Sequence, residues 1–228
     1  MDDVAEASNV MSYQSPRVDF PEWTETVALY RRRFPGSGVG IYAPADWARL
    51  LRALQLVQGR SVLDVGVSNG ALLQMLSRSG RFERIEGIDI HVHSMLILPE
   101  GCQTHHMSVA DMSKFGDDAF DSVVCMEVLE HLETPEFDAA MLELRRVVGQ
   151  RLVVAVPYNE PLPLWWHDRP GGHRQRFDPA RLRRTFPDAL ASLQKRPGGV
   201  DWILLVEGGE AVMRGFVPLT KLLATLAA

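Results

Sequence analysis

Residues 62–70, with the sequence VLDVGVSNG, decide the fold of this chain. The run at residues 61–65 is short and apolar and stops at Gly66, which is typical of a strand buried inside a parallel sheet. Glycine at positions 66 and 70 lets the backbone take positive φ angles and approach a bound group closely. A helix expected over residues 71–79 begins with free N–H donors. The stretch therefore predicts a strand, a glycine turn and a helix that together can hold a ligand.

The sequence after this stretch alternates between strands and helices. Asp89 lies in the next expected strand, residues 85–90, where its carboxylate can accept both hydroxyl groups of a ribose. Further strands are expected at residues 105–109, 120–126 and 152–156, a helix at residues 135–148, and a closing hairpin at residues 189–193 and 202–206. Such alternation predicts a parallel α/β sheet that is covered by helices on both faces.

Helical patterns also flank this core. Residues 20–34 and 44–58 carry apolar side chains at helical spacing, Asp178-Pro179 is typical of a helix start, and residues 211–228 are expected to form a terminal helix. We expect a lead-in and helical cap over residues 1–58 and a core domain over residues 59–228.

Composition narrows the function further. The 228 residues include 24 Lys and Arg against 29 Asp and Glu, a net charge of −5, which is poorly suited to gripping a nucleic-acid backbone. The acidic start lacks the apolar segment of a secretory signal, and no apolar run approaches the ~18–20 residues that span a bilayer. Cys102 and Cys125 are too few for a disulfide framework. These features predict a cytoplasmic protein with no membrane segment and no nucleic-acid partner.

Four motifs occur in a fixed order: residues 62–70, the acid Asp89, the triplet Ala110-Asp111-Met112, and residues 120–132 with the sequence FDSVVCMEVLEHL. Together they resemble the class I S-adenosylmethionine-dependent methyltransferases, over roughly residues 60–157. The resemblance implies a Rossmann-like, doubly wound, mostly parallel sheet of seven strands with an N-terminal helical cap. It also implies S-adenosylmethionine as the cofactor and transfer of its methyl group to an acceptor.

The resemblance further assigns cofactor contacts to individual residues. Asp64, Gly66, Ser68 and Gly70 would surround the methionine part, Asp89 the ribose, Ile90, Asp111 and Met112 the adenine, and Met126 the sulfonium. Ser68 stands where the family has the middle glycine of Gly-x-Gly-x-Gly, and a serine fits that turn if its φ is negative. Two structural alternatives stay open, because Asp64 could cap the turn and Asp111 could cap a short helix.

A second cluster, Glu127-Val128-Leu129-Glu130-His131, follows the strand at residues 120–126. If residues 127–131 begin a helical turn, Glu127, Glu130 and His131 share one face. Two carboxylates and an imidazole could bind a divalent metal, with His173 as a fourth ligand, or act as acid and base. The segment resembles the metal-binding set of Hen1-like RNA 2′-O-methyltransferases and the same segment of ubiquinone-biosynthesis-type methyltransferases. Alternatively, His131 binds no metal and serves as a core hydrogen bonder or proton acceptor. As the catalytic base that takes the acceptor's proton, we expect His131 or Glu127 first and His173 next.

The substrate is expected at the carboxyl ends of the strands. Aromatic side chains there could form a pocket or belong to the core: Trp23, Tyr30, Tyr42, Trp47, Tyr158, Trp165, Trp166 and Phe177. For Trp23 and Trp47 we favour the core. Arg169, Arg174 and Arg176 could meet an anionic group, whereas Arg181, Arg183 and Arg184 are expected on a solvated helix face.

We therefore expect methyl transfer to an oxygen, with nitrogen second, of a small-molecule metabolite or a sugar or natural-product acceptor. One alternative is a metal-dependent RNA 2′-O-methyltransferase, and another is a non-catalytic partner protein that binds S-adenosylmethionine. A nicotinamide oxidoreductase is disfavoured, because the residues after the fourth strand contain no Tyr-x-x-x-Lys pair.

Overall fold

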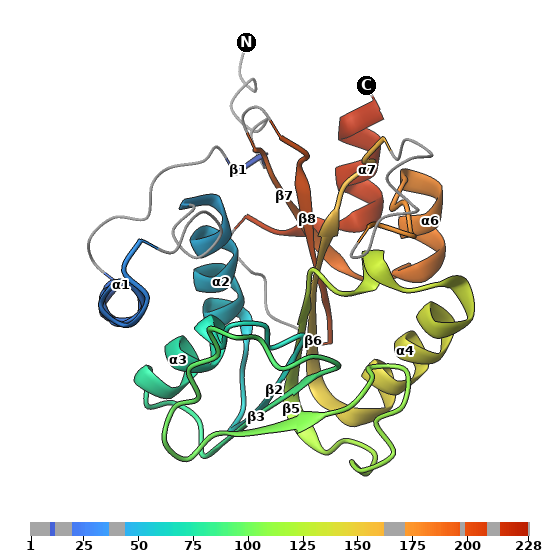
Figure 1. The fold of residues 1–228 in the computed structure, drawn as a ribbon. Coiled ribbons are helices and arrows are strands. Elements are labelled where there is room, and N and C mark those ends of the chain that lie inside the picture. The colour runs from blue at the N-terminus through green and yellow to red at the C-terminus, as the bar shows by residue number, and fades with distance from the viewer. Residues whose placement is uncertain are drawn as a thin grey trace.

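The computed structural model describes residues 10–11, 20–36, 44–161, 172–196, 199–208 and 215–227. One mixed sheet runs through the middle of this part of the chain (Figure 1). Its strands are β1 (Val10–Met11), β2 (Ser61–Val65), β3 (Arg84–Asp89), β4 (Gln103–His106), β5 (Phe120–Met126), β6 (Val148–Pro157), β7 (Leu190–Gln194), β8 (Trp202–Glu207) and β9 (Val217–Pro218). The helices are α1 (Pro21–Arg33), α2 (Pro44–Leu56), α3 (Ala71–Arg78), α4 (Thr134–Val147), α6 (Pro179–Thr185) and α7 (Leu219–Ala227), with a 3₁₀ turn η1 (Leu129–His131).

The strand order is β1-β7-β8-β6-β5-β2-β3-β4, with β9 beside β7. The strands β4, β3, β2, β5 and β6 are parallel to one another, and β8 pairs antiparallel with both β6 and β7. This mostly parallel sheet confirms the predicted Rossmann-like fold. Because these five strands run in the same direction, their carboxyl ends all lie at the same edge of the sheet, where ligands of such folds bind.

The strand count differs from the predicted seven because β1 and β9 contain only two residues each and pair with β7. Runs this short leave no periodic pattern in a sequence. For the same reason the expected terminal helix begins later than predicted, at Leu219, after β9. The strand expected at residues 105–109 lies at Gln103–His106.

Two apolar layers enclose the sheet. Helices α1, α2 and α3 cover one face, and α4, α6 and α7 cover the other (Figure 1). Tyr30 and Trp47 are buried in the first layer, and Phe137 and Phe186 are buried in the second. The predicted cap helices thus pack directly on the sheet, and the boundary expected near residue 58 falls in the turn between α2 and β2, where it stays a prediction.

None of the helices that the structure describes combines the length and the apolar character of a membrane-spanning helix. Cys102 and Cys125 are both buried and unbridged, as small apolar residues are expected to be.

Candidate functional site

The glycine turn after β2 has the left-handed backbone that its sequence predicts. Gly66 and Gly70 have φ angles of +85° and +83°, and a Cβ at Gly70 would lie 2.8 Å from the carbonyl oxygen of Ile97. Ser68 was expected to fit this turn with a negative φ, but its φ is +49°, in the region that glycine favours. The side chain of Asn69 caps α3 by accepting a hydrogen bond from the Ala71 amide at 3.0 Å.

Asp89 lies directly beside this turn. One carboxylate oxygen accepts a hydrogen bond from the Ser68 amide and the other from the His91 amide, both at 2.8 Å. A carboxylate has about four acceptor positions, so each oxygen keeps capacity for another donor. The side chain of Ile90, expected under the adenine, is 53% exposed. The structure therefore brings the glycine turn and the expected ribose acid together.

Asp64 is the buried acid of this region. It is 4% exposed, and burial, followed by the nearby charge of Asp89, raises the pKa of its carboxyl to about 7. A positive charge placed nearby would favour the ionised form and reverse this shift.

Asp111 and Met112, expected to contact the adenine, are engaged in bonds within the protein. Asp111 is exposed, and its carboxylate accepts a hydrogen bond from the Ser113 amide at 3.2 Å. It therefore holds a turn, whereas the short helix of the capping alternative does not form at this position. The bonds from Ser113 also lower the pKa of Asp111. The amide of Met112 donates to the Glu143 carboxylate of α4 at 2.7 Å, so an adenine contact at this amide would require that bond to break.

The chain bends sharply after β5, at Glu127. Its φ is +58°, and η1 begins only at Leu129, so the prediction that residues 127–131 form one helical turn is wrong. The Glu127 carboxylate pairs with Arg49 of α2, whose side chain is 2% exposed and stacks 4.2 Å from the ring centre of Trp202. Sequence analysis missed Arg49, which stands among the apolar residues of α2.

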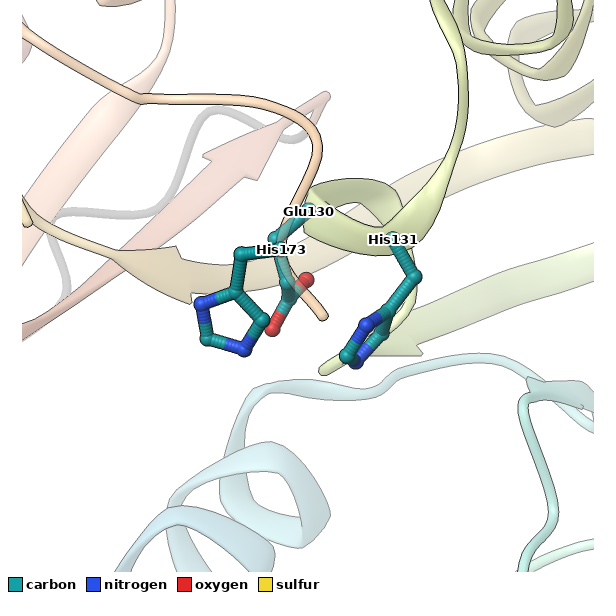
Figure 2. A group of neighbouring side chains, drawn as sticks. All are labelled: Glu130, His131 and His173. Carbon is teal, nitrogen blue, oxygen red and sulfur yellow. The ribbon is translucent and has the colours of Figure 1, made fainter. Parts of the chain in front are cut away.

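Glu130, His131 and His173 form one compact group, the EHH cluster (Figure 2). Their possible ligand atoms all lie within 4.8 Å of one another, and Glu127 is not part of the group. Glu130 is completely buried, and neither carboxylate oxygen has a hydrogen-bond partner within the described residues. Burial, the largest influence, raises the pKa of Glu130 to about 8.

Hydrogen bonds orient both imidazoles of the EHH cluster. Nδ1 of His131 lies 3.3 Å from the carbonyl oxygen of Gly172, which can only accept, so Nδ1 is the donor. In the neutral imidazole this leaves the lone pair on Nε2. Nδ1 of His173 bonds to the carboxylate of Glu160 in the same way. No sequence pattern pointed to Glu160, because it contacts a histidine 13 positions later in the chain.

The segment that carries His173 is tied to η1 through the backbone. The amides of Arg174 and Gln175 donate to the Glu130 carbonyl at 2.6 and 3.0 Å. These bonds explain why His173 arrives beside His131, with the two rings 4.9 Å apart in an edge-on arrangement. The structure thus brings together three of the four predicted metal ligands.

The predicted aromatic and basic residues divide between core and surface. Trp47 belongs to the core as expected, and Tyr30 and Phe177 are also fully buried. Tyr42, Trp165, Trp166 and Arg169 lie outside the described residues. Arg181 does not lie on a solvated face, since its guanidinium stacks 4.4 Å from the ring centre of Phe137, whereas Arg183 and Arg184 are exposed as predicted.

Residues 39–189 match a family model described as a methyltransferase domain, which covers more than half of the chain. The chain belongs to the methyltransferase domain family. The predicted enzyme class is therefore confirmed.

Other relatives of this methyltransferase domain agree with that assignment. A ubiquinone biosynthesis O-methyltransferase of Paracidovorax citrulli is 36% identical over 87 residues, which are 35% of this chain and 36% of that protein. The match thus spans about a third of the length of that curated relative.

Solved structures show the same fold. N-methyltransferase NodS of Bradyrhizobium japonicum, in complex with S-adenosylhomocysteine, has a TM-score of 0.58 at 15% identity and covers 82% of this chain and 99% of its own. Magnesium protoporphyrin IX methyltransferase of Synechocystis, with bound S-adenosylhomocysteine, has a TM-score of 0.57 at 16% identity and covers 83% and 97%.

Proposed function

We propose that this methyltransferase domain transfers the methyl group of S-adenosylmethionine to an oxygen atom of a small-molecule acceptor. The observation that carries the proposal is the placement of two chemically distinct groups at the carboxyl ends of neighbouring strands. The glycine turn and Asp89 follow β2 and β3, and the EHH cluster follows β5. One group suits a nucleoside donor, and the other suits the acceptor.

The residues around the glycine turn fit the cofactor. The left-handed angles at Gly66 and Gly70 turn the chain so that α3 begins directly after the turn, and a helix N-terminus of this kind favours an anionic group. Asp89, already fixed by two amides, would accept the ribose hydroxyls, and the exposed Ile90 would pack on the adenine. The buried Asp64 would face the positively charged methionine end. Bound there, S-adenosylmethionine supplies a sulfonium methyl that is already activated for displacement.

The EHH cluster fits a divalent metal ion. In the part of the chain that the structure describes, neither oxygen of the buried Glu130 carboxylate has a hydrogen-bond partner, and ionising such a carboxylate is costly unless a cation compensates it. The bonds from Nδ1 of His131 to a carbonyl and from Nδ1 of His173 to Glu160 are typical of imidazoles that ligate through Nε2. A divalent ion held by Glu130, His131 and His173 would act as a Lewis acid toward an acceptor hydroxyl.

The two roles predicted for His131 exclude each other, because a nitrogen that ligates a metal has no lone pair with which to take a proton. In the first role His131 holds and orients the metal ion. In the second it removes the proton of the acceptor as a general base. The predicted second base, Glu127, is already engaged by the Arg49 guanidinium. In either case the chain's main contribution is to place donor and acceptor in line.

Three observations favour a small-molecule oxygen. The curated relative named above is an O-methyltransferase of ubiquinone biosynthesis. Two imidazoles beside a carboxylate suit removal of a hydroxyl proton, either by a base or by a metal. The net charge of −5 disfavours RNA as the acceptor. The identity of the acceptor and the cytoplasmic location stay predictions.

Ligand binding tests the proposal directly. We expect S-adenosylmethionine and S-adenosylhomocysteine to raise the melting temperature and to bind by calorimetry, while NAD and NADP do neither. A response to the nicotinamide nucleotides alone would overturn the proposal. With cofactor binding shown, EDTA treatment followed by Mg²⁺, Mn²⁺ or Zn²⁺ in an assay of oxygen acceptors decides between the two roles of His131.

A further inference from the structure

Tyr30 of α1 is a buried polar residue that the proposed chemistry does not use. Its side chain is fully buried, and its hydroxyl donates a hydrogen bond to the carbonyl oxygen of Asn69, inside the glycine turn. Burial raises the pKa of Tyr30 above its ordinary value, so the hydroxyl stays protonated and remains a donor at any working pH. This bond reaches from the N-terminal helix to the turn across 39 residues of chain.

The Asn69 carbonyl is a junction of three segments. It also accepts a hydrogen bond from the Ile97 amide at 3.1 Å, and the Ile97 carbonyl in turn accepts one from the Gln74 side chain of α3 at 3.1 Å. Residues 90–97 follow directly after Asp89, so the same carbonyl fixes the turn and the segment that leads away from the expected ribose acid. Tyr30 is the member of this junction that comes from outside the core domain.

The turn needs such support because its backbone is strained. Gly66, Ser68 and Gly70 all have positive φ angles, and Ser68, unlike the two glycines, is strained there because its Cβ crowds the backbone in the left-handed region. Conformations of this kind persist only where the surroundings hold them in place. A ligand that contacts the turn therefore binds more weakly when the turn can relax.

We propose that Tyr30 is a positioning residue for the cofactor: by bonding the Asn69 carbonyl, it makes the docking of helix α1 part of the S-adenosylmethionine site. The inference rests on the proposed placement of the cofactor against the glycine turn. It predicts that α1 and the cofactor stabilise each other, because a coupling between two events acts equally in both directions.

The test is Tyr30→Phe, which keeps the buried ring and removes only the hydroxyl. We expect the Kd for S-adenosylhomocysteine to rise about five- to tenfold, the effect of losing roughly one hydrogen bond. The KM for the cofactor should rise similarly, while kcat at saturating cofactor stays near the parent value. Ser122→Ala is the matched control, since Ser122 is equally buried and donates to a backbone carbonyl, that of Gln58, at 2.8 Å from the opposite end of β5.

A structural role alone would lower the melting temperature of both variants and leave both Kd values unchanged, which would overturn the inference. If Tyr30→Phe folds poorly, amide hydrogen exchange on the parent protein decides. We expect exchange in α1 to slow when S-adenosylhomocysteine binds, and unchanged exchange there would contradict the coupling. If the parent binds no S-adenosylhomocysteine, the proposed function fails as well; if the parent binds and Tyr30→Phe binds equally tightly, only this inference fails.

Discussion

Asp64 makes the stability of the unliganded protein depend on pH. Its carboxyl has a pKa of about 7 in the native state against 3.8 ordinarily, because it is buried and lies near Asp89. As the pH rises, the unfolded chain therefore releases this proton first, and the free energy of unfolding falls until the native carboxyl has also ionised. Each pH unit over which only the unfolded state has lost this proton lowers the free energy of unfolding by ~1.4 kcal/mol. Integrated from pH 5 to pH 8, the two titration curves of Asp64 give a loss of about 2.5 kcal/mol.

The assay is urea unfolding of the parent and of Asp64→Asn at pH 5 and pH 8. The variant should lose less stability than the parent over this interval, by about 2.5 kcal/mol, or roughly 5–10 °C in melting temperature. Asp138→Asn, which removes an exposed carboxylate, serves as the control and should follow the parent. Equal pH dependence of the parent and Asp64→Asn would show that Asp64 ionises normally in the native state, and the reasoning from burial would fail.

Three further substitutions probe the turn and the EHH cluster. Asp89→Ala should raise the Kd for S-adenosylhomocysteine at least tenfold by calorimetry, since it removes both the expected ribose acceptor and the partner of two backbone amides; an unchanged Kd would contradict the ribose role. His131→Ala should keep that Kd but lose most turnover with an oxygen acceptor and, if the cluster holds metal, most Mn²⁺ binding; normal turnover would remove His131 from the chemistry. Gly70→Ala should lower the free energy of unfolding in urea by about 2–4 kcal/mol, because the φ of Gly70 is +83° and a backbone oxygen blocks the new Cβ. The control Gly80→Ala, with a φ of +62° and open space around the Cβ, should lower it by only about 1–2 kcal/mol. Equal losses would argue against the blocked Cβ.

Much of the fold follows from local pattern. The strand at residues 61–65 and the strand at residues 120–126 have the predicted bounds, because buried parallel strands are continuous apolar runs that end at a glycine or a polar residue. Asp178 caps α6 as its sequence predicts, accepting a hydrogen bond from the Arg181 amide at 2.8 Å. Such features depend on residues a few positions apart, and a sequence displays them directly.

The features that were missed depend on contacts between distant segments. The bend at Glu127 replaces the predicted helical turn, and its carboxylate pairs with an arginine 78 positions earlier in the chain. Ser68 has a positive φ although serine ordinarily avoids that region, because the turn is held by Asp89 and by its glycine neighbours. Glu160 orients His173 only after the chain has folded back. No local pattern encodes these contacts, so they could not be predicted from spacing alone.

Two buried carboxylates, those of Asp64 and Glu130, lie at this edge of the sheet, and the same physical reason accounts for both. Asp64 is the last residue but one of β2, and Glu130 follows β5, the strand paired beside it. In both residues burial opposes ionisation. An unpaired buried acid lowers stability near neutral pH, and a fold that gained nothing from it would replace it with an apolar residue of similar size. A cationic ligand reverses the balance, because the same burial that penalises an isolated charge strengthens its attraction to a charge of opposite sign. In the proposed site, a sulfonium cofactor beside Asp64 and, in the metal-holding role of the EHH cluster, a divalent ion beside Glu130 would each supply that charge.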